Sequence, residues 1–312
     1  MTPIDVDERG AKKELNETAE RLEREAAESI GRDLHTPMRF LPVPGIYYDV
    51  PFTDYLQWDC LSQSTLKEGR ESMAHLAAAI AHERVKEVTD DMALGTALHC
   101  AFLEPELMPL HVVRWDGGRR YGGKWDEFCD EHADKTILTP DRYELLVGMV
   151  RSMRRHPFVR EWWAKTEAVE VSAVGEIEGV LMKGRTDALT PEPLVDLKKV
   201  RSTHPAAIMR TVLTFGYHIQ AHIYQQLFDR GRFVLLCVED KPPYDVVPFE
   251  LSPAMLRIGR DEATDLLAKY KQCKASGAWP GRSDKIVTLE APEWLGRGDG
   301  ITLGDDSAFD EE

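Results

Sequence analysis

The stretch that decides the fold is KGRTDALTPEPLVDLKK, residues 183–199. It lies within two runs of strand-forming residues, and the prolines of the segment TPEP, residues 190–193, separate them. A pattern of this kind predicts two strands, over residues 180–189 and 194–200, joined by a tight turn. The sequence therefore predicts a β-hairpin in the middle of the chain.

Three charged side chains of this hairpin are placed in a way that suits catalysis. Residues two apart on a strand share a face, so Asp196 and Lys198 point the same way, and the hairpin can bring Asp187 beside them. Carboxylate oxygens hold Mg²⁺, and a lysine nearby can orient or activate a water. The alternative is a solvated strand face, because D-x-K occurs by chance in many proteins. The hairpin alone leaves this choice open.

Length and composition describe a chain that can form a sizeable core. It has 312 residues, of which 43% are hydrophobic, enough for one large domain or two small ones. No apolar run reaches the ~20 residues of a membrane helix and the first residues do not resemble a signal peptide, so we expect a cytoplasmic protein. The five cysteines include no C-x-x-C pair, which argues against a zinc knuckle or a cysteine-ligated cluster.

The formal net charge of −15 is unevenly distributed along the chain. Residues 1–33 and 299–312 are both acidic, and the second segment contains six acidic residues and no basic one. A negative total usually argues against nucleic acid as a partner. Because much of this charge lies at the two ends, a basic groove in the central part is still compatible with the sequence.

The order of the predicted elements indicates an α/β protein. After an N-terminal helical portion, whose last helix is expected over residues 139–165, come three strands, two helices, two more strands and a long helix over residues 252–276. This order predicts a mixed central β-sheet flanked by helices. We expect a charged helical or disordered arm over residues 1–40, a single domain over 41–280 and a disordered acidic tail over 281–312.

One predicted helix, over residues 90–104, carries a histidine inside an apolar run. Gly95 on this helix is expected to permit close packing, and His99 follows one turn later. A single histidine in such a run is more often a hydrogen-bonded core residue than a ligand. His99 becomes a candidate ligand only if the fold brings it to Asp187 and Asp196.

Two other segments are candidates for contact with nucleic acid. Ser64 and Lys67 lie at a predicted helix start, where amides and the helix dipole can hold a phosphate, and simple capping is the alternative. Residues 111–135 are expected to form a glycine-rich loop whose aromatic residues alternate with three basic ones, Arg119, Arg120 and Lys124. A loop of this kind suits contact with a DNA strand. An irregular surface insertion is the alternative.

Four short motifs in a fixed order carry a family resemblance. They are G-x-x-x-H at residues 95–99, G-R-x-D at 184–187, D-x-K at 196–198 and Q-x-x-x-Y at 220–224. In this order they resemble the PD-(D/E)XK nuclease superfamily, in the branch that includes the RecB nuclease domain and lambda exonuclease. The likeness is greatest to the RecE type, exodeoxyribonuclease VIII, and extends over roughly residues 42–275.

The resemblance implies a role for each matched residue. The metal ligands would be Asp187, Asp196, His99 and the backbone carbonyl of Leu197. Lys198 would orient or activate the attacking water, and Gln220 and Tyr224 would position the lysine or the scissile phosphate. The family often has a further glutamate before these acids, and four candidates stay open: Glu104, Glu170, Glu176 and Glu178. Arg185 would contact a phosphate.

The same resemblance implies an activity and partners. It implies a deoxyribonuclease that needs Mg²⁺, with Mn²⁺ as a substitute, and that degrades linear double-stranded DNA in the 5′→3′ direction. The remaining 3′ single strands would serve recombination with a RecT-like annealing protein, and the enzyme would be a homo-oligomeric ring. Two alternatives stay open: a related nuclease with another polarity or an endonuclease role, and a catalytically inactive acidic binding protein.

Overall fold

The computed structural model describes residues 40–81 and 88–290. The expected arm over residues 1–40 and most of the expected tail over 281–312 lie outside the described residues, so these domain boundaries stay predictions. Within the described residues, no helix is both long enough and apolar enough to cross a bilayer.

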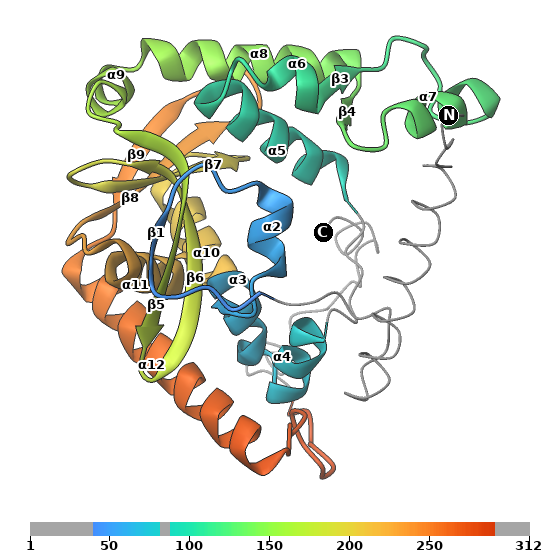
Figure 1. Cartoon of the computed structure of the whole chain (residues 1–312). Helices are drawn as coiled ribbons and strands as arrows, with labels where there is room; N and C mark the ends of the chain where they lie inside the picture. The colour runs from blue at the N-terminus through green and yellow to red at the C-terminus, as the bar shows by residue number, and fades with distance from the viewer. Residues whose placement is uncertain (1–39, 82–87, 291–312) are drawn as a thin grey trace, which may run out of the picture.

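A seven-stranded mixed sheet forms the centre of the molecule (Figure 1). Its strands follow the order β1-β5-β6-β7-β8-β9, and β2 pairs in parallel with β6. Strands β7 and β8 are also parallel, and the other neighbours are antiparallel. The strands are β1 Gly45–Tyr47, β2 Leu61–Ser62, β5 Ala168–Ile177, β6 Val180–Leu189, β7 Leu194–Val200, β8 Phe233–Glu239 and β9 Val246–Glu250. The predicted hairpin is therefore β6–β7, and the expected α/β class with a mixed sheet is confirmed.

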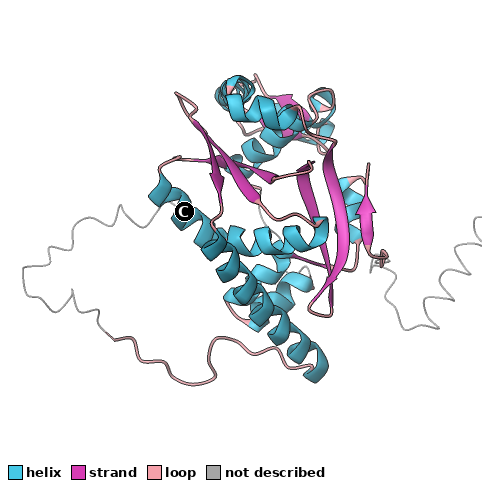
Figure 2. Ribbon diagram, turned by 90° about the vertical axis from the view of Figure 1, so that its left-hand side faces the viewer, coloured by secondary structure: helices cyan, strands magenta, loops and turns pink. Residues whose placement is uncertain are grey.

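Two groups of helices cover the two faces of this sheet (Figures 1 and 2). One face packs against α5, α8 and α9, and the other against α10 and α11, with α12 lying along α11. Strand β8 shows the alternation: Leu236 and Val238 pack with the first group, and Phe233 and Leu235 with the second. A strand buried on both faces explains why its sequence is apolar from residue 233 to residue 238. These helices are α5 Asp90–Leu103, α8 Pro140–Arg155, α9 Pro157–Trp163, α10 Pro205–Phe215, α11 Tyr217–Phe228 and α12 Pro253–Ser276.

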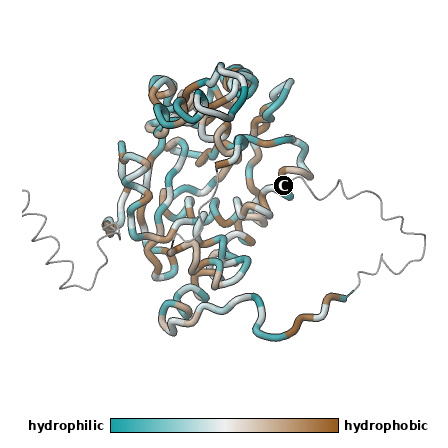
Figure 3. Tube along the Cα trace, turned by 90° about the vertical axis from the view of Figure 1, so that its right-hand side faces the viewer, coloured by the Kyte–Doolittle hydropathy of each residue, from teal (hydrophilic) through white to brown (hydrophobic). Residues whose placement is uncertain are grey.

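Several short elements complete the molecule. They are α2 Phe52–Gln57, α3 Gln63–Leu66, the 3₁₀ turn η1 Lys67–Arg70, α4 Met73–Ile80, α6 Met108–His111 and α7 Gly123–Glu131, with a separate parallel pair, β3 Val112–Arg114 and β4 Thr136–Leu138. Figure 3 shows hydrophilic and hydrophobic segments following one another closely along the chain. This pattern fits elements that bury one face and expose the other.

The expectation of a loop over residues 111–135 is wrong. The segment contains β3 and α7, and Trp115 is 8% exposed. The Trp115 ring packs against Trp125 and Phe128, with ring centroids 5.4 and 4.8 Å apart. Trp115, Trp125 and Phe128 therefore form a small aromatic core of their own. The presence of several large aromatic residues in this segment was the feature of the sequence that indicated it.

Two expectations about helices also need correction. A single helix over residues 139–165 was expected, but His156 has an extended backbone and Pro157 begins α9. The residue before a proline is forced out of helical geometry, which accounts for the break. Gly95 does not serve close packing, because a Cβ built there would meet no atom within 4 Å.

Candidate active site

The site forms where β6 and β7 separate. The two strands pair through Ala188 and Val195, and no further pair joins them among the described residues. Where a neighbouring strand would supply a backbone acceptor, the Leu197 amide donates instead to Asp187 Oδ2 at 2.5 Å. Asp187 is 7% exposed, and this bond fixes its carboxylate at the point of separation. The opening leaves room for a side chain from α5.

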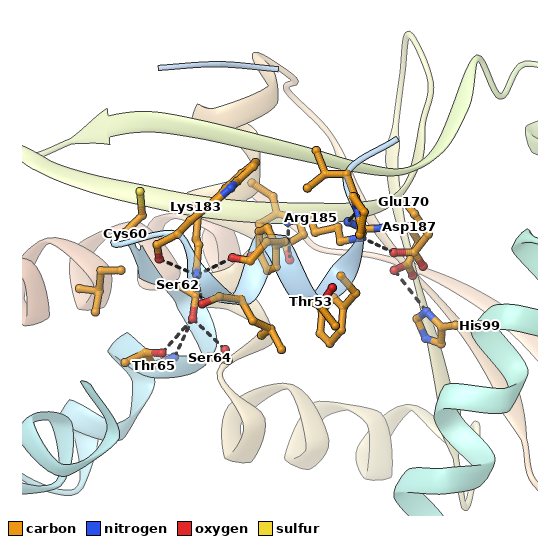
Figure 4. A pocket seen from close by; sticks show the side chains of 18 of the residues that line it. Thr53, Cys60, Ser62, Ser64, Thr65, His99, Glu170, Lys183, Arg185 and Asp187 are labelled. Carbon is orange, nitrogen blue, oxygen red and sulfur yellow. Dashed lines mark hydrogen bonds and ion pairs between the residues drawn. The ribbon is translucent and has the colours of Figure 1, made fainter. Parts of the chain in front are cut away.

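That side chain is the imidazole of His99. Its Nδ1 lies 3.4 Å from Asp187 Oδ1, and its Nε2 lies 3.1 Å from the carbonyl oxygen of Leu197. Its neighbours Leu98 and Phe102 are buried in the core between α5 and the sheet, so the helix cannot easily turn the ring away. Figure 4 shows His99 pointing from its helix toward Asp187. Three of the predicted ligands therefore meet: His99, Asp187 and the carbonyl of Leu197.

Glu170 on β5 completes a cluster that could hold a cation. Ligand atoms of His99, Glu170 and Asp187 all lie within 4.8 Å of one another. The ladder between β5 and β6 pairs the residues on either side of Glu170 but skips it, and its φ is 51°. A glutamate with positive φ is uncommon, and the register on both sides places Glu170 directly opposite Asp187, on the same face of the sheet. Of the four candidate glutamates, Glu170 is the one in this cluster.

Asp196 and Lys198 lie beside this cluster rather than within it. Asp196 is 3% exposed, its Oδ1 accepts a hydrogen bond from Gln220 Nε2 at 2.6 Å, and its Oδ2 lies 2.5 Å from Lys198 Nζ. The ammonium group of Lys198 also lies 4.7 Å from the centre of the Tyr217 ring. Among the described residues no well-directed hydrogen bond reaches Asp196 Oδ2. Its predicted role as a metal ligand stays a prediction.

The Q-x-x-x-Y motif spans two strands from one face of α11. Gln220 holds Asp196 on β7, whereas the hydroxyl of Tyr224 accepts a long hydrogen bond of 3.4 Å from the Arg185 amide on β6. The Tyr224 ring packs under Gly184, where a Cβ would come within 3.0 Å of it. Tyr224 therefore supports the strand that carries Asp187 and does not touch the cluster.

Burial and crowding of the acids control their protonation. Burial alone would lower the pKa of His99, but the neighbouring Asp187 carboxylate outweighs burial and raises this pKa to about 9. For Asp187, burial alone would raise the pKa, yet His99, Lys198 and the Leu197 amide hold it below its usual value. The pKa values of Glu170 and Asp196 are both raised, first by burial and also by the charge of Asp187. Asp187 and Asp196 are buried and Glu170 is half-buried, and a bound cation would offset the repulsion between these acids.

Arg185, predicted to contact phosphate, binds protein groups instead. Its Nε donates to Glu170 Oε2 at 2.6 Å, and its Nη1 donates to the Val50 carbonyl at 2.8 Å and to Ser172 Oγ at 3.2 Å. The guanidinium group thus fixes the carboxylate of Glu170. Its prediction as a DNA-binding residue has no support from these contacts.

The other predicted DNA contacts are not gathered around the cluster. Ser62, rather than Ser64, caps the four-residue helix α3, and Lys67 lies 5.7 Å from the centre of the Phe215 ring. Arg119 stacks on Tyr121, and Arg120 pairs with Asp90 at 2.7 Å and lies over Trp125. Of the predicted DNA contacts, only Ser64 and Arg185 line the cleft described next, and Lys67, Arg119, Arg120 and Lys124 do not.

A large cleft of about 1840 Å³ opens over the cluster. It extends from His99, Glu170 and Asp187 past β2 and α2 toward Lys271 and Lys274 on α12. The cleft can therefore take an extended ligand that is bound along its length.

One wall of the cleft depends on Lys183, whose role the sequence analysis missed. Its Nζ donates to the carbonyls of Tyr55, Leu56 and Trp58 at 2.8, 3.1 and 2.9 Å, at the C-terminal end of α2 (Figure 4). The available signal was a lysine on the same strand face as Asp187 and Arg185.

Comparison with known families agrees with this geometry. The chain belongs to a family described as a PDDEXK-like domain of unknown function (DUF3799), whose model matches residues 62–292. The expected membership of the PD-(D/E)XK superfamily is confirmed, whereas the RecE branch stays a prediction. No curated protein matches the chain.

One of the similar solved structures shows the same fold. A crystal structure of a presumed exonuclease from Eubacterium rectale is similar with a TM-score of 0.55 and 13% identity, over 77% of this chain and 94% of that one. A phage-related exonuclease from Haemophilus somnus 129PT matches with a TM-score of 0.31 and 10% identity, over 70% of this chain and 96% of that one. At this identity the first likeness extends to the fold alone.

Proposed function

We propose that this protein is a metal-dependent nuclease that hydrolyses phosphodiester bonds in DNA. The observation that carries the proposal is the convergence of His99, Glu170, Asp187 and the Leu197 carbonyl, from α5, β5, β6 and β7, at one end of a long cleft. Membership of a PDDEXK-like family and the fold shared with a presumed exonuclease support it.

The residues present fit a divalent cation. Two carboxylates, one imidazole and one carbonyl oxygen form a donor set that suits Mg²⁺ or Mn²⁺. The buried Oδ2 of Asp196, which no well-directed hydrogen bond reaches among the described residues, adds a further oxygen beside them. When bound, the cation supplies polarisation of a phosphate oxygen and a more acidic water.

The protein groups around the donor set position the substrate and stabilise charge. Lys198, held between Asp196 and the Tyr217 ring, presents an ammonium group that can donate hydrogen bonds to the attacking water or to the phosphate as negative charge develops. Gln220 holds Asp196 in place for this lysine. Arg185 does the same for Glu170.

The finer proposal is a 5′→3′ exonuclease on linear double-stranded DNA that leaves 3′ single strands for recombination. It rests on the motif resemblance to RecE-type enzymes and on the fold shared with a presumed exonuclease. Action on DNA ends within a homo-oligomeric ring, together with a RecT-like annealing protein, belongs to the same proposal.

Digestion of end-labelled duplex DNA tests both the general proposal of a nuclease and the finer proposal of a 5′→3′ exonuclease. We expect Mg²⁺ to release nucleotides from linear DNA, chelation to stop the release, and Asp187→Asn and Lys198→Met to lose it. Exposed Glu176→Gln is the matched control and should retain full activity. No metal-dependent cleavage of any DNA by the folded wild type would refute the nuclease. Cleavage of closed circles, or release from the 3′ end first, would refute only the finer proposal.

A further inference from the structure

A second groove, separate from the cleft, lies between α5, α6 and α8. It has a volume of about 490 Å³, and its floor is mostly apolar, with Met108, Tyr143, Val147 and Val150 among its residues. Val147, one of these apolar residues, is 40% exposed to solvent. Such a surface is ready to receive an apolar side chain of a bound segment.

One edge of this groove is strongly basic. Arg151, Arg154 and Arg155 line it, and their spacing of three and four places them on one face of α8. Among the residues that the structure describes, no carboxylate lies within ion-pair distance of any of the three, and none lines the groove. The dipole of α8 favours positive charge in its last turn. The helix dipole explains the arginines, but it does not explain why an open apolar surface lies beside them.

We propose that this groove, which we call the arginine groove, binds the chain's own acidic segment DDSAFDEE, residues 305–312. Phe309 is the apolar side chain that would enter the floor, and the flanking acids would pair with the arginines. This segment contains five acids and no base, so its charge complements an edge whose three arginines form no ion pair within residues 40–81 and 88–290.

The length of the chain allows the contact within one molecule. The 22 residues from 291 to 312 can extend over roughly 70 Å. A compact domain of about 245 residues has a diameter of roughly 45 Å, so the segment can reach any part of its surface.

The cleft is the less favourable place for this segment. Its lining includes Glu104, Glu170 and Asp187, which would repel additional carboxylates. The arginine groove has only positive charge among its charged lining residues. Ala101, at its edge, lies on α5 two residues after His99, so the occupied groove would hold the helix that carries a site residue.

Photo-crosslinking in the full chain tests the proposal. With Phe309→p-benzoylphenylalanine, we expect irradiation to join position 309 to the segment from Tyr143 to Arg155, and the adduct to remain monomeric at low concentration. R151E/R154E should lower the yield about tenfold, and the exposed R257E on α12 should leave it unchanged. Adding D310R/E311R to R151E/R154E should restore the crosslink, while thermal unfolding confirms that each variant is folded.

Three outcomes would overturn the proposal. One is crosslinking to residues outside the groove, and another is crosslinking only between two molecules, which would assign the groove to a second copy. The third is an unchanged yield in R151E/R154E. A loss of DNA affinity in R151E/R154E together with an unchanged yield would assign the arginines to DNA. None of these results depends on nuclease activity.

Discussion

At the scale of single residues, the most informative feature is the backbone of Glu170. A positive φ at a non-glycine residue costs of order 1–3 kcal/mol and persists where the surroundings enforce it. Here Arg185 holds the carboxylate, and the ladder on both sides of the residue is intact. The hydrogen bond from Arg185 is therefore the contact that fixes the Glu170 carboxylate in this backbone conformation.

Replacement of this carboxylate gives a direct prediction. Glu170→Gln keeps the size of the side chain but removes its negative charge, so we expect about 10–100-fold weaker binding of Mn²⁺. The measurement is the Mn²⁺ concentration that gives half-maximal DNA cleavage. Glu176→Gln, on the same strand but exposed, is the control. An equal effect in both variants would show that Glu170 is not part of the metal site.

The sequence could identify several site residues but not this one. Strand periodicity predicted that Asp196 and Lys198 share a face and that the hairpin can bring Asp187 beside them. The G-x-x-x-H motif of residues 95–99 identified His99 as a candidate ligand. Glu170 was one of four candidate glutamates, and the choice depends on the pairing register of β5 with β6, which places Glu170 opposite Asp187 and which the sequence alone does not give. The guanidinium group of Arg185 has several N–H donors, which can bind either a phosphate or a carboxylate. The sequence does not distinguish the two, and in the fold Arg185 donates to the carboxylate of Glu170.

At the scale of elements, the contact between α11 and α12 depends on one glycine. A Cβ at Gly259 would overlap the backbone carbonyl of His218 on α11, so the two helices touch through their backbones. Gly95 is a glycine inside another helix that faces open space. A comparison of Gly259 with Gly95 therefore separates two effects on the free energy of unfolding, that of close backbone packing and that of helix propensity.

Substitution of both glycines by alanine should have opposite effects. We expect Gly259→Ala to lower the free energy of unfolding by about 3 kcal/mol, because the backbones must move apart. Gly95→Ala should raise it by roughly 0.5–1 kcal/mol, because alanine favours a helix. Urea denaturation measures both values. A similar change in the two variants would contradict the inferred backbone contact.

A polar group also joins these helices to the 3₁₀ turn. Glu262 on α12 accepts hydrogen bonds from His218 Nε2 at 2.7 Å and from Arg70 Nε at 2.8 Å. Burial alone would raise the pKa of Glu262, but these hydrogen bonds outweigh it and hold the pKa below its usual value. The charged carboxylate is therefore the form that the fold stabilises.

The contribution of Glu262 should depend on pH. Its folded-state pKa is lower than its unfolded-state pKa of about 4.3, so the stabilisation is present above that pH and lost as pH falls through the folded-state value. Glu262→Gln should cost about 1 kcal/mol at pH 7, since the side chain is 30% exposed, and less at pH 4. Urea denaturation at both pH values tests this. The exposed pair of Arg232 with Glu250 provides the control, because Glu250→Gln should change stability little.

At the scale of the whole molecule, the site exists because remote segments meet. The central hairpin, the α/β class and most helices followed from periodicity, capping and proline positions. The separation of β6 and β7 did not, because it depends on Asp187 replacing a strand partner of Leu197 and on α5 packing over the opening. The arrangement couples the fold to the charge of the site, since a bound cation would offset the repulsion between the buried Asp187 and the half-buried Glu170.

This coupling predicts that a divalent cation stabilises the folded chain. At a concentration of 100 times its Kd, Mn²⁺ should add about 2.7 kcal/mol, which corresponds to an increase in Tm of roughly 5–10 °C for a domain of this size. Differential scanning calorimetry without DNA measures it, so the result does not depend on catalysis. Asp187→Asn should remove most of the increase in Tm. It removes the negative charge of a carboxylate that contacts His99 and the Leu197 amide and that lies in the cluster with Glu170. An equal increase in wild type and Asp187→Asn would mean that the cation binds elsewhere. The charges of the three acids would then be balanced by His99, Lys198 and Arg185, which pair with Asp187, Asp196 and Glu170.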